Sequence, residues 1–169
     1  IATAQAAAGL GTVRISGENA LTIADSVFSA VSGKKICDTP GYRALYGKVH
    51  EGETVIDDAV ALVFRAPKSY TGEDVVEISC HGGLYILKRV LRAVLNAGAD
   101  PAEGGEFTKR AFLNGKMDLS EAEAVMSLIS ASGEEARAAT LNALDGALSN
   151  EINACRDRLA VTAAFMAAW

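Results

Sequence analysis

A single carboxylate stands among apolar residues in the stretch Val75–Ser79. Val75, Val76 and Ile78 supply the β-branched content of a short buried strand, and Glu77 falls inside it. A charge in such a place is costly unless a partner pairs with it. Glu77 could accept two parallel hydrogen bonds from an amidine-like edge of a ligand. It could also be a structural residue paired with Arg14 across the sheet, which is the interpretation that the residues alone favour.

The adjacent pair Cys80-His81 follows this strand. Neighbouring residues on an extended strand point to opposite faces, so the two side chains cannot readily share a proton. Two potential ligands do not make a zinc site. His81-Gly82-Gly83 could expose backbone N–H groups to an anion at a helix start, but paired glycines more often permit a tight turn. We therefore predict no catalytic residue and no metal site.

The elements that must position Glu77 alternate between strand and helix patterns. Alternating or β-branched runs predict strands at 12–16, 44–50, 55–64 and 75–79, and apolar residues at helical spacing predict helices at 20–31, 84–97 and 108–113. This order predicts an α+β fold with a mixed β-sheet and packed helices.

From Asp118 onward the strand signal disappears. Ser120-Glu121-Ala122-Glu123 and Ser132-Gly133-Glu134-Glu135 both fit a capping box, so a helix is predicted to begin at each. The second helix should run from about residue 133 to the chain end and carry a bundle seam. The seam repeats at spacings of three and four: Leu141, Leu144, Leu148, Ile152, Cys155, Leu159, Thr162 and Met166. We thus expect an α/β domain at 1–117 and the beginning of a helical domain at 118–169.

Composition narrows the functional classes. The 169 residues are 50% hydrophobic with a formal net charge of -5, which argues against broad nucleic-acid or membrane binding by this chain alone. Three cysteines without metal-type spacing indicate a reduced, cytoplasmic setting. No apolar run is long enough to span a bilayer. The chain lacks an initial methionine and stops within an apolar helical pattern, so we expect it to be truncated.

Two blocks of sequence carry a family resemblance. The first reads Ser-Tyr-Thr-Gly-Glu-Asp at 69–74, then Val-Glu at 76–77 and Cys-His-Gly-Gly at 80–83. The second reads Gly-Glu-Phe-Thr-Lys-Arg-Ala-Phe-Leu-Asn-Gly-Lys-Met-Asp-Leu at 105–119, followed by Glu-Ala-Glu-Ala at 121–124. In this order the blocks resemble the amino-terminal domain of the MnmE/TrmE family of tRNA-modification GTPases. The resemblance runs from Ile1 to about Met166.

This resemblance implies a fold, a ligand and partners. The fold would be that of a tetrahydrofolate-binding domain, and the ligand 5-formyl-tetrahydrofolate, the one-carbon donor for modification of the wobble uridine of tRNA. Glu77 matches the family's pterin-facing glutamate, and Arg14 and Lys116 match its other folate contacts in this portion. The implied partners are a second copy in a homodimer, an FAD protein of the MnmG/GidA type, and tRNA bound by the full-length complex.

GTP, with Mg²⁺ and K⁺, would enter only through a G domain that this chain lacks, because no Gly-x-x-x-x-Gly-Lys-Ser/Thr motif occurs in the sequence. Two alternatives remain. One is an assembly and dimerisation scaffold without a ligand, and the other is a folate-dependent aminomethyltransferase-like domain, which would require a catalytic acid that the sequence does not reveal.

Overall fold

The fold is described from a computed structural model of the whole chain. The structure describes residues 1–4, 6–130, 133–134, 140–141, 144 and 146–167. The chain divides into two compact units, Ile1–Arg110 and Ala111–Trp169, and each is described by itself.

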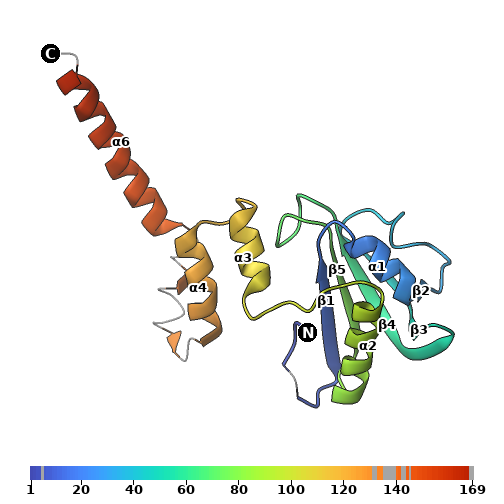
Figure 1. Cartoon of the computed structure of the whole chain (residues 1–169). Helices are drawn as coiled ribbons and strands as arrows, with labels where there is room; N and C mark the ends of the chain where they lie inside the picture. Colours follow the sequence, from blue (N-terminus) through green and yellow to red (C-terminus); the bar gives the residue numbers. More distant parts are fainter. Residues whose placement is uncertain (5, 131–132, 135–139, 142–143, 145, 168–169) are drawn as a thin grey trace. The chain divides into compact units, whose positions relative to one another are not determined.

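The first unit contains the strands and the helices that cover them (Figure 1). In chain order the elements are β1 (Leu10–Ser16), α1 (Ala20–Val27), β2 (Phe28–Ala30), β3 (Arg43–Glu51), β4 (Thr54–Phe64), β5 (Val75–His81), α2 (Leu84–Asn96) and α3 (Glu106–Leu113), whose last residues belong to the second unit. The predicted α+β class is confirmed.

The five strands form one sheet in the order β1-β5-β4-β3-β2. Every pairing among them is antiparallel, so the prediction of a mixed sheet was wrong in this respect. Helix α1 joins β1 to β2, which run in the same direction but lie at opposite edges of the sheet, so they are not paired with each other. β5 lies inside the sheet, hydrogen-bonded to β1 on one side and β4 on the other.

Helices α1 and α2 pack on the same face of the sheet. Strand residues that alternate in sequence, such as Val13, Val63 and Ile78, are fully buried with Ala24 and Leu87 from the two helices. Period-two burial of this kind leaves the intervening strand residues on the opposite face. That opposite face carries Arg14 and Glu77.

Strand β2 was not predicted, because residues 28–31 continue the apolar spacing of α1. In the structure the helix ends at Val27, and Phe28 pairs with Val49 of β3. A Cβ added to Gly47 would lie 2.2 Å from the carbonyl oxygen of Ser29, so β2 approaches β3 as closely as only a glycine allows. Tertiary pairing here overrides the local helical pattern.

In the second unit α4 (Leu119–Ser130) begins with a reciprocal cap. The N–H of Glu121 donates to Oδ1 of Asp118 at 2.9 Å, and the N–H of Asp118 donates to Oε2 of Glu121 at 2.6 Å. This is a capping box with Asp118 as the cap, so the predicted start at Ser120 was two residues late. The side chain of Ser149 also donates to Asp118.

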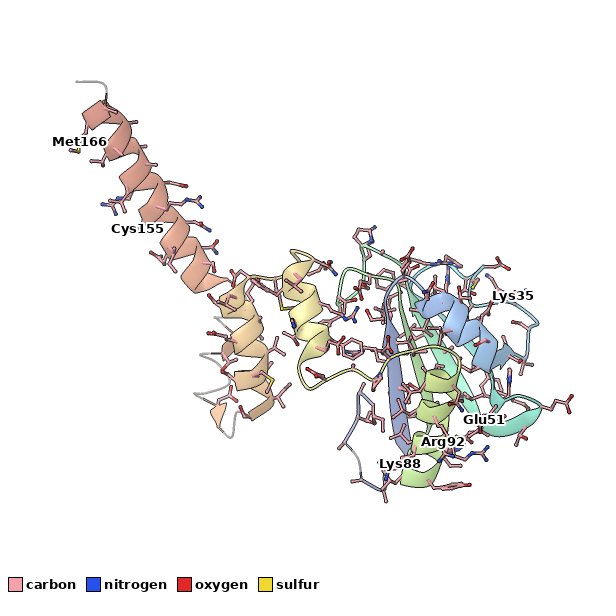
Figure 2. All side chains as sticks on the ribbon, viewed as in Figure 1. Lys35, Glu51, Lys88, Arg92, Cys155 and Met166 are labelled. Carbon is pink, nitrogen blue, oxygen red and sulfur yellow. The ribbon has the colours of Figure 1, made fainter. Side chains whose placement is uncertain are left out.

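The predicted second helix is not continuous. Gly146 has a positive φ of 73° in a turn, and α6 (Ala147–Ala167) starts after it. Two residues of its predicted start, Ser132 and Glu135, lie outside the described residues. Along α6 the predicted seam residues Ile152, Leu159 and Met166 are all exposed, and Figure 2 shows how the side chains stand along this helix. Among the described residues, no helix has the length and apolar character that crossing a membrane requires.

Candidate functional site

Glu77 lies on β5, next to the edge strand β1, on the sheet face opposite α1 and α2. The register places it opposite Arg14 of β1 on one side and opposite Leu62 of β4 on the other. Its side chain is 23% exposed and that of Arg14 is 29% exposed. The acid is therefore neither in bulk water nor on the far side of the sheet from Arg14, which is the arrangement that ligand binding by Glu77 requires.

Arg14 and Glu77 form a direct ion pair. Nε and Nη2 of Arg14 each lie 2.7 Å from Oε1 of Glu77. Among the described residues no hydrogen bond reaches the other oxygen, Oε2. A carboxylate can accept hydrogen bonds on both oxygens. The acid thus keeps acceptor capacity on a partly exposed face.

Two aromatic rings complete the surroundings of Arg14. Its Cζ atom lies 5.6 Å from the ring centroid of Tyr70 and 5.4 Å from that of Phe107. Both distances fall within the range of cation–π attraction. Neither ring was predicted as part of the site, although Tyr70 and Phe107 lie in the two motif blocks. Their position within these motifs was the sequence feature that could have identified them as site residues.

A polar network links the segments that carry these rings. Ser16 Oγ lies 2.7 Å from Thr71 Oγ1 and donates to Glu73 at 2.7 Å. Arg110 reaches Glu73 at 3.2 Å and Glu106, one helical turn earlier, at 2.7 Å. The hydrogen bond from Arg110 lowers the pKa of Glu106. The network ties β1, the loop before β5 and the start of α3 together within the first unit.

A contact between the loop and α3 adds to this network. The hydroxyl of Tyr70 lies 2.9 Å from Oγ1 of Thr108 on α3. Tyr70 is therefore fixed at its far end, while its ring stays 39% exposed. An aromatic ring held in this way offers a preformed flat surface beside Arg14.

A cavity of about 280 Å³ shares Arg14 and Phe107 with the site. It is lined by the strand segment Arg14–Ser16, the start of α1, the end of α2 with the following loop, and Phe107 and Arg110. Glu77 does not line it. Arg14, which pairs with Glu77, and Phe107, which contacts Arg14, both line the cavity.

Lys116, the third predicted contact, lies in the second unit. It follows α3, is exposed, and its backbone N–H donates to the carbonyl of Ala111 at 2.9 Å. The structure brings Arg14 and Glu77 together, whereas a role for Lys116 stays a prediction.

Cys80 and His81 have different partners. The thiol of Cys80 is buried and lies 3.6 Å from the carbonyl oxygen of Gly11, and burial raises its pKa to about 11. The ring of His81 is 73% exposed and bonds Asp57, a partner that the sequence analysis missed. The sequence could not show that Asp57 is this partner, because its neighbour Asp58 offers the same carboxylate. In the structure Asp58 pairs with Lys48 at 3.0 Å.

Among the described residues no group of three or more His, Cys, Asp or Glu side chains could hold a metal ion.

Comparison with known families adds to this geometry. The model described as "GTP-binding protein TrmE N-terminus" matches residues 1–116, which cover the sheet, its helices and both motif blocks up to Lys116. The chain belongs to the TrmE N-terminal family. The resemblance seen in the motif blocks is thereby confirmed.

Three relatives of this TrmE N-terminal chain are each named tRNA modification GTPase MnmE. The relative from Clostridioides difficile (strain 630) is 45% identical over 159 residues, that from Alkaliphilus metalliredigens (strain QYMF) 48% over 161, and that from Symbiobacterium thermophilum (strain DSM 24528 / JCM 14929 / IAM 14863 / T) 49% over 160. Each match covers 94% of this chain and 35% of the relative. The chain thus spans about a third of the length of these relatives.

Proposed function

We propose that the first unit binds a reduced folate, 5-formyl-tetrahydrofolate, and does so as part of a tRNA-modification GTPase. The observation that carries this proposal is Glu77, a half-buried carboxylate with one oxygen open to further hydrogen bonds and two aromatic rings nearby. The family relationship supplies the tRNA-modification context through the names of the relatives.

The residues present fit the chemistry of this ligand. The pterin edge of a folate offers parallel N–H donors, and a carboxylate held on a rigid strand is a matching acceptor. The rings of Tyr70 and Phe107 suit a flat heterocycle. Arg14 can bind carbonyl or carboxylate oxygens in bidentate fashion. When bound, such a folate supplies a one-carbon group, and the residues of this chain hold and orient it.

The remaining partners follow from the same context and are proposals. The chain would act as a homodimer, together with an FAD protein of the MnmG/GidA type, on the wobble uridine of tRNA. GTP hydrolysis with Mg²⁺ and K⁺ would belong to a separate G domain. For Lys116, an ammonium suited to a single carboxylate, the substitution Lys116→Ala in the titration below measures its part in binding.

A second candidate is an assembly scaffold that binds no folate. The Arg14–Glu77 pair favours it, since an ion pair across neighbouring strands is also what a purely structural residue would make. The two candidates differ in one measurable property, which is whether the ligand binds at all.

Calorimetric titration of the full 169-residue chain with 5-formyl-tetrahydrofolate tests the proposal. We expect binding, and we expect Glu77→Gln to weaken it by about 2 kcal/mol or more, roughly thirtyfold, through loss of a charge-assisted contact. The matched control is Glu51→Gln, because Glu51 (labelled in Figure 2) pairs with Arg89 of α2 at 3.2 Å in a similar half-buried contact. If saturating ligand produces no heat and no thermal shift, the scaffold is favoured. If Glu77→Gln binds 5-formyl-tetrahydrofolate with the same affinity as the wild type, Glu77 is not part of the binding site.

A further inference from the structure

The exposed side of α2 carries positive charge and no acid. The helix contains three cations, Lys88, Arg89 and Arg92, but neither aspartate nor glutamate. Its apolar side, which includes Leu87, is buried against the sheet. Tyr85, Lys88 and Arg92 follow one another at spacings of three and four, so they form one row along the helix. All three are exposed, the ring of Tyr85 to 71%.

An acid from the neighbouring hairpin is already engaged by this helix. Oε2 of Glu51 accepts a hydrogen bond from Arg89 at 3.2 Å, and Oε1 accepts one from Asn96 at 3.0 Å. Both oxygens of Glu51 are therefore in use. Within the described part of the chain no hydrogen bond or ion pair reaches the side chain of Lys88 or Arg92, both labelled in Figure 2. Two positive charges are thus left uncompensated in one row.

Two uncompensated cations beside an exposed ring suit the backbone of a nucleic acid. Lysine and arginine neutralise phosphates, and an exposed aromatic ring can stack on an unpaired base. A lipid surface fits less well, because an interfacial helix must bury its apolar side in the membrane and that side of α2 packs in the core. The formal net charge of -5 opposes general attraction to RNA, so such a contact must be local.

We propose that the row formed by Tyr85, Lys88 and Arg92 is a contact surface for RNA. Lys88 and Arg92 each neutralise a backbone phosphate, and Tyr85 stacks on an unpaired base next to them. This inference rests on the proposed function, in which RNA enters through relatives named as tRNA modification GTPases, and deepens it by giving the RNA a surface on this chain. Because α2 packs on the sheet face opposite Glu77, RNA held there would not compete with a folate at Glu77.

The test is fluorescence anisotropy of a labelled, unmodified tRNA transcript titrated with the full 169-residue chain over a series of salt concentrations. We expect the wild type to bind, and the double variant Lys88→Ala with Arg92→Ala to bind more weakly at low salt by about tenfold or more. The slope of log K against log salt should become shallower by about 1.5, since each phosphate contact contributes roughly 0.7 to 0.9.

The matched control is the double variant Lys34→Ala with Lys35→Ala. It removes two exposed lysines from the loop after β2, and therefore the same net charge, but leaves α2 intact. We expect its affinity and salt slope to stay close to those of the wild type. Equal losses in the two double variants would mean that tRNA responds only to overall charge, and would overturn the proposal. A wild-type chain that binds phosphatidylserine vesicles but no tRNA would overturn it as well.

A third variant separates stacking from charge. Tyr85→Ala should weaken tRNA binding by about fivefold or more and leave the salt slope unchanged, because the ring contributes no charge. An unchanged affinity would overturn the role of the ring. The substituted positions on α2 are exposed and alanine favours helix, so we expect the thermal midpoints to stay close to that of the wild type.

The proposed folate site and the RNA surface can fail separately. Binding of tRNA that depends on Lys88 and Arg92, without any binding of 5-formyl-tetrahydrofolate, would retain the surface and reject the folate site. Folate binding that is lost in Glu77→Gln, together with equal tRNA affinities of the two double variants, would retain the folate site and reject the surface.

Discussion

Nδ1 of His81 lies 2.8 Å from Oδ1 of Asp57, and the backbone N–H of His81 donates to Oδ2 of the same carboxylate at 2.8 Å. One acid from β4 thus holds both the backbone and the ring of the last residue of β5. The contact fixes the strand end at the point where the chain turns into α2.

This contact predicts an acid dependence of stability. Burial acts to raise the pKa of Asp57, but the hydrogen bonds from the backbone and ring of His81 outweigh it, and the pKa lies below its ordinary value of 3.8. Because the folded-state pKa is below the unfolded one, the stabilisation is fully present above the unfolded pKa and is lost as the pH falls through the folded pKa. We expect the urea midpoint to fall less between pH 6 and pH 3 in Asp57→Asn than in the wild type. Asp58→Asn is the control, since its partner is the exposed Lys48, and an equal fall in wild type and Asp57→Asn would contradict the prediction.

The adjacent glycines of the Cys-His-Gly-Gly motif predict opposite responses to the same substitution. A Cβ on Gly82 would lie 2.5 Å from the carbonyl oxygen of Ala8 and 2.6 Å from that of Leu10, whereas a Cβ on Gly83 meets only Ile86, at 4.0 Å. We expect Gly82→Ala to lower the free energy of unfolding by about 3 kcal/mol, because backbone must move. Gly83→Ala should change it by less than about 1 kcal/mol. Chemical denaturation of both variants decides, and equal effects would mean that close approach is not why Gly82 is needed.

The buried thiol predicts selective labelling. Burial raises the pKa of Cys80 from 9.0 to about 11, so its thiolate fraction at pH 8 should be roughly a hundredfold smaller than that of a thiol with the ordinary value. We expect iodoacetamide at pH 8 to modify the exposed Cys155 first and to leave Cys80 unmodified in the folded chain. Peptide mass spectrometry after timed quenching measures this, and in concentrated urea the difference should vanish. Rapid modification of Cys80 in the native chain would show that the strand opens readily.

The sequence predicted the elements whose signals are local. The hairpin of β3 and β4, the amphipathic α2 and the strand containing Glu77 each carry a clear periodicity, and the structure contains all of them. The errors arose where a longer-range contact decides. Phe28 of β2 pairs with β3 despite its helical spacing. Helix α4 begins directly after its cap Asp118, because Glu121 reaches back to that residue and not to a cap at Ser120.

The sequence could predict the acid and the cation of the candidate site but not the two aromatic rings beside them. Glu77 stands out as a charge in an apolar strand, and Arg14 alternates with the buried Val13. Tyr70 and Phe107 reach Arg14 from a loop and from the start of a helix, and neither segment has a periodicity that fixes the direction of a ring. The two segments are joined by the contacts of Ser16, Glu73 and Arg110, which only the folded chain brings together.

The pairing of β1 with β5 has a consequence for folding. Arg14 and Glu77 are 63 residues apart in the chain and meet only because these two strands align at one offset. Displacing β1 by a single position would set Val13 or Ile15 against Glu77 and turn the strand's apolar residues toward water. The Arg14–Glu77 pair therefore forms only when β1 and β5 align correctly. A chain that has joined these strands wrongly would lack the acid's partner altogether.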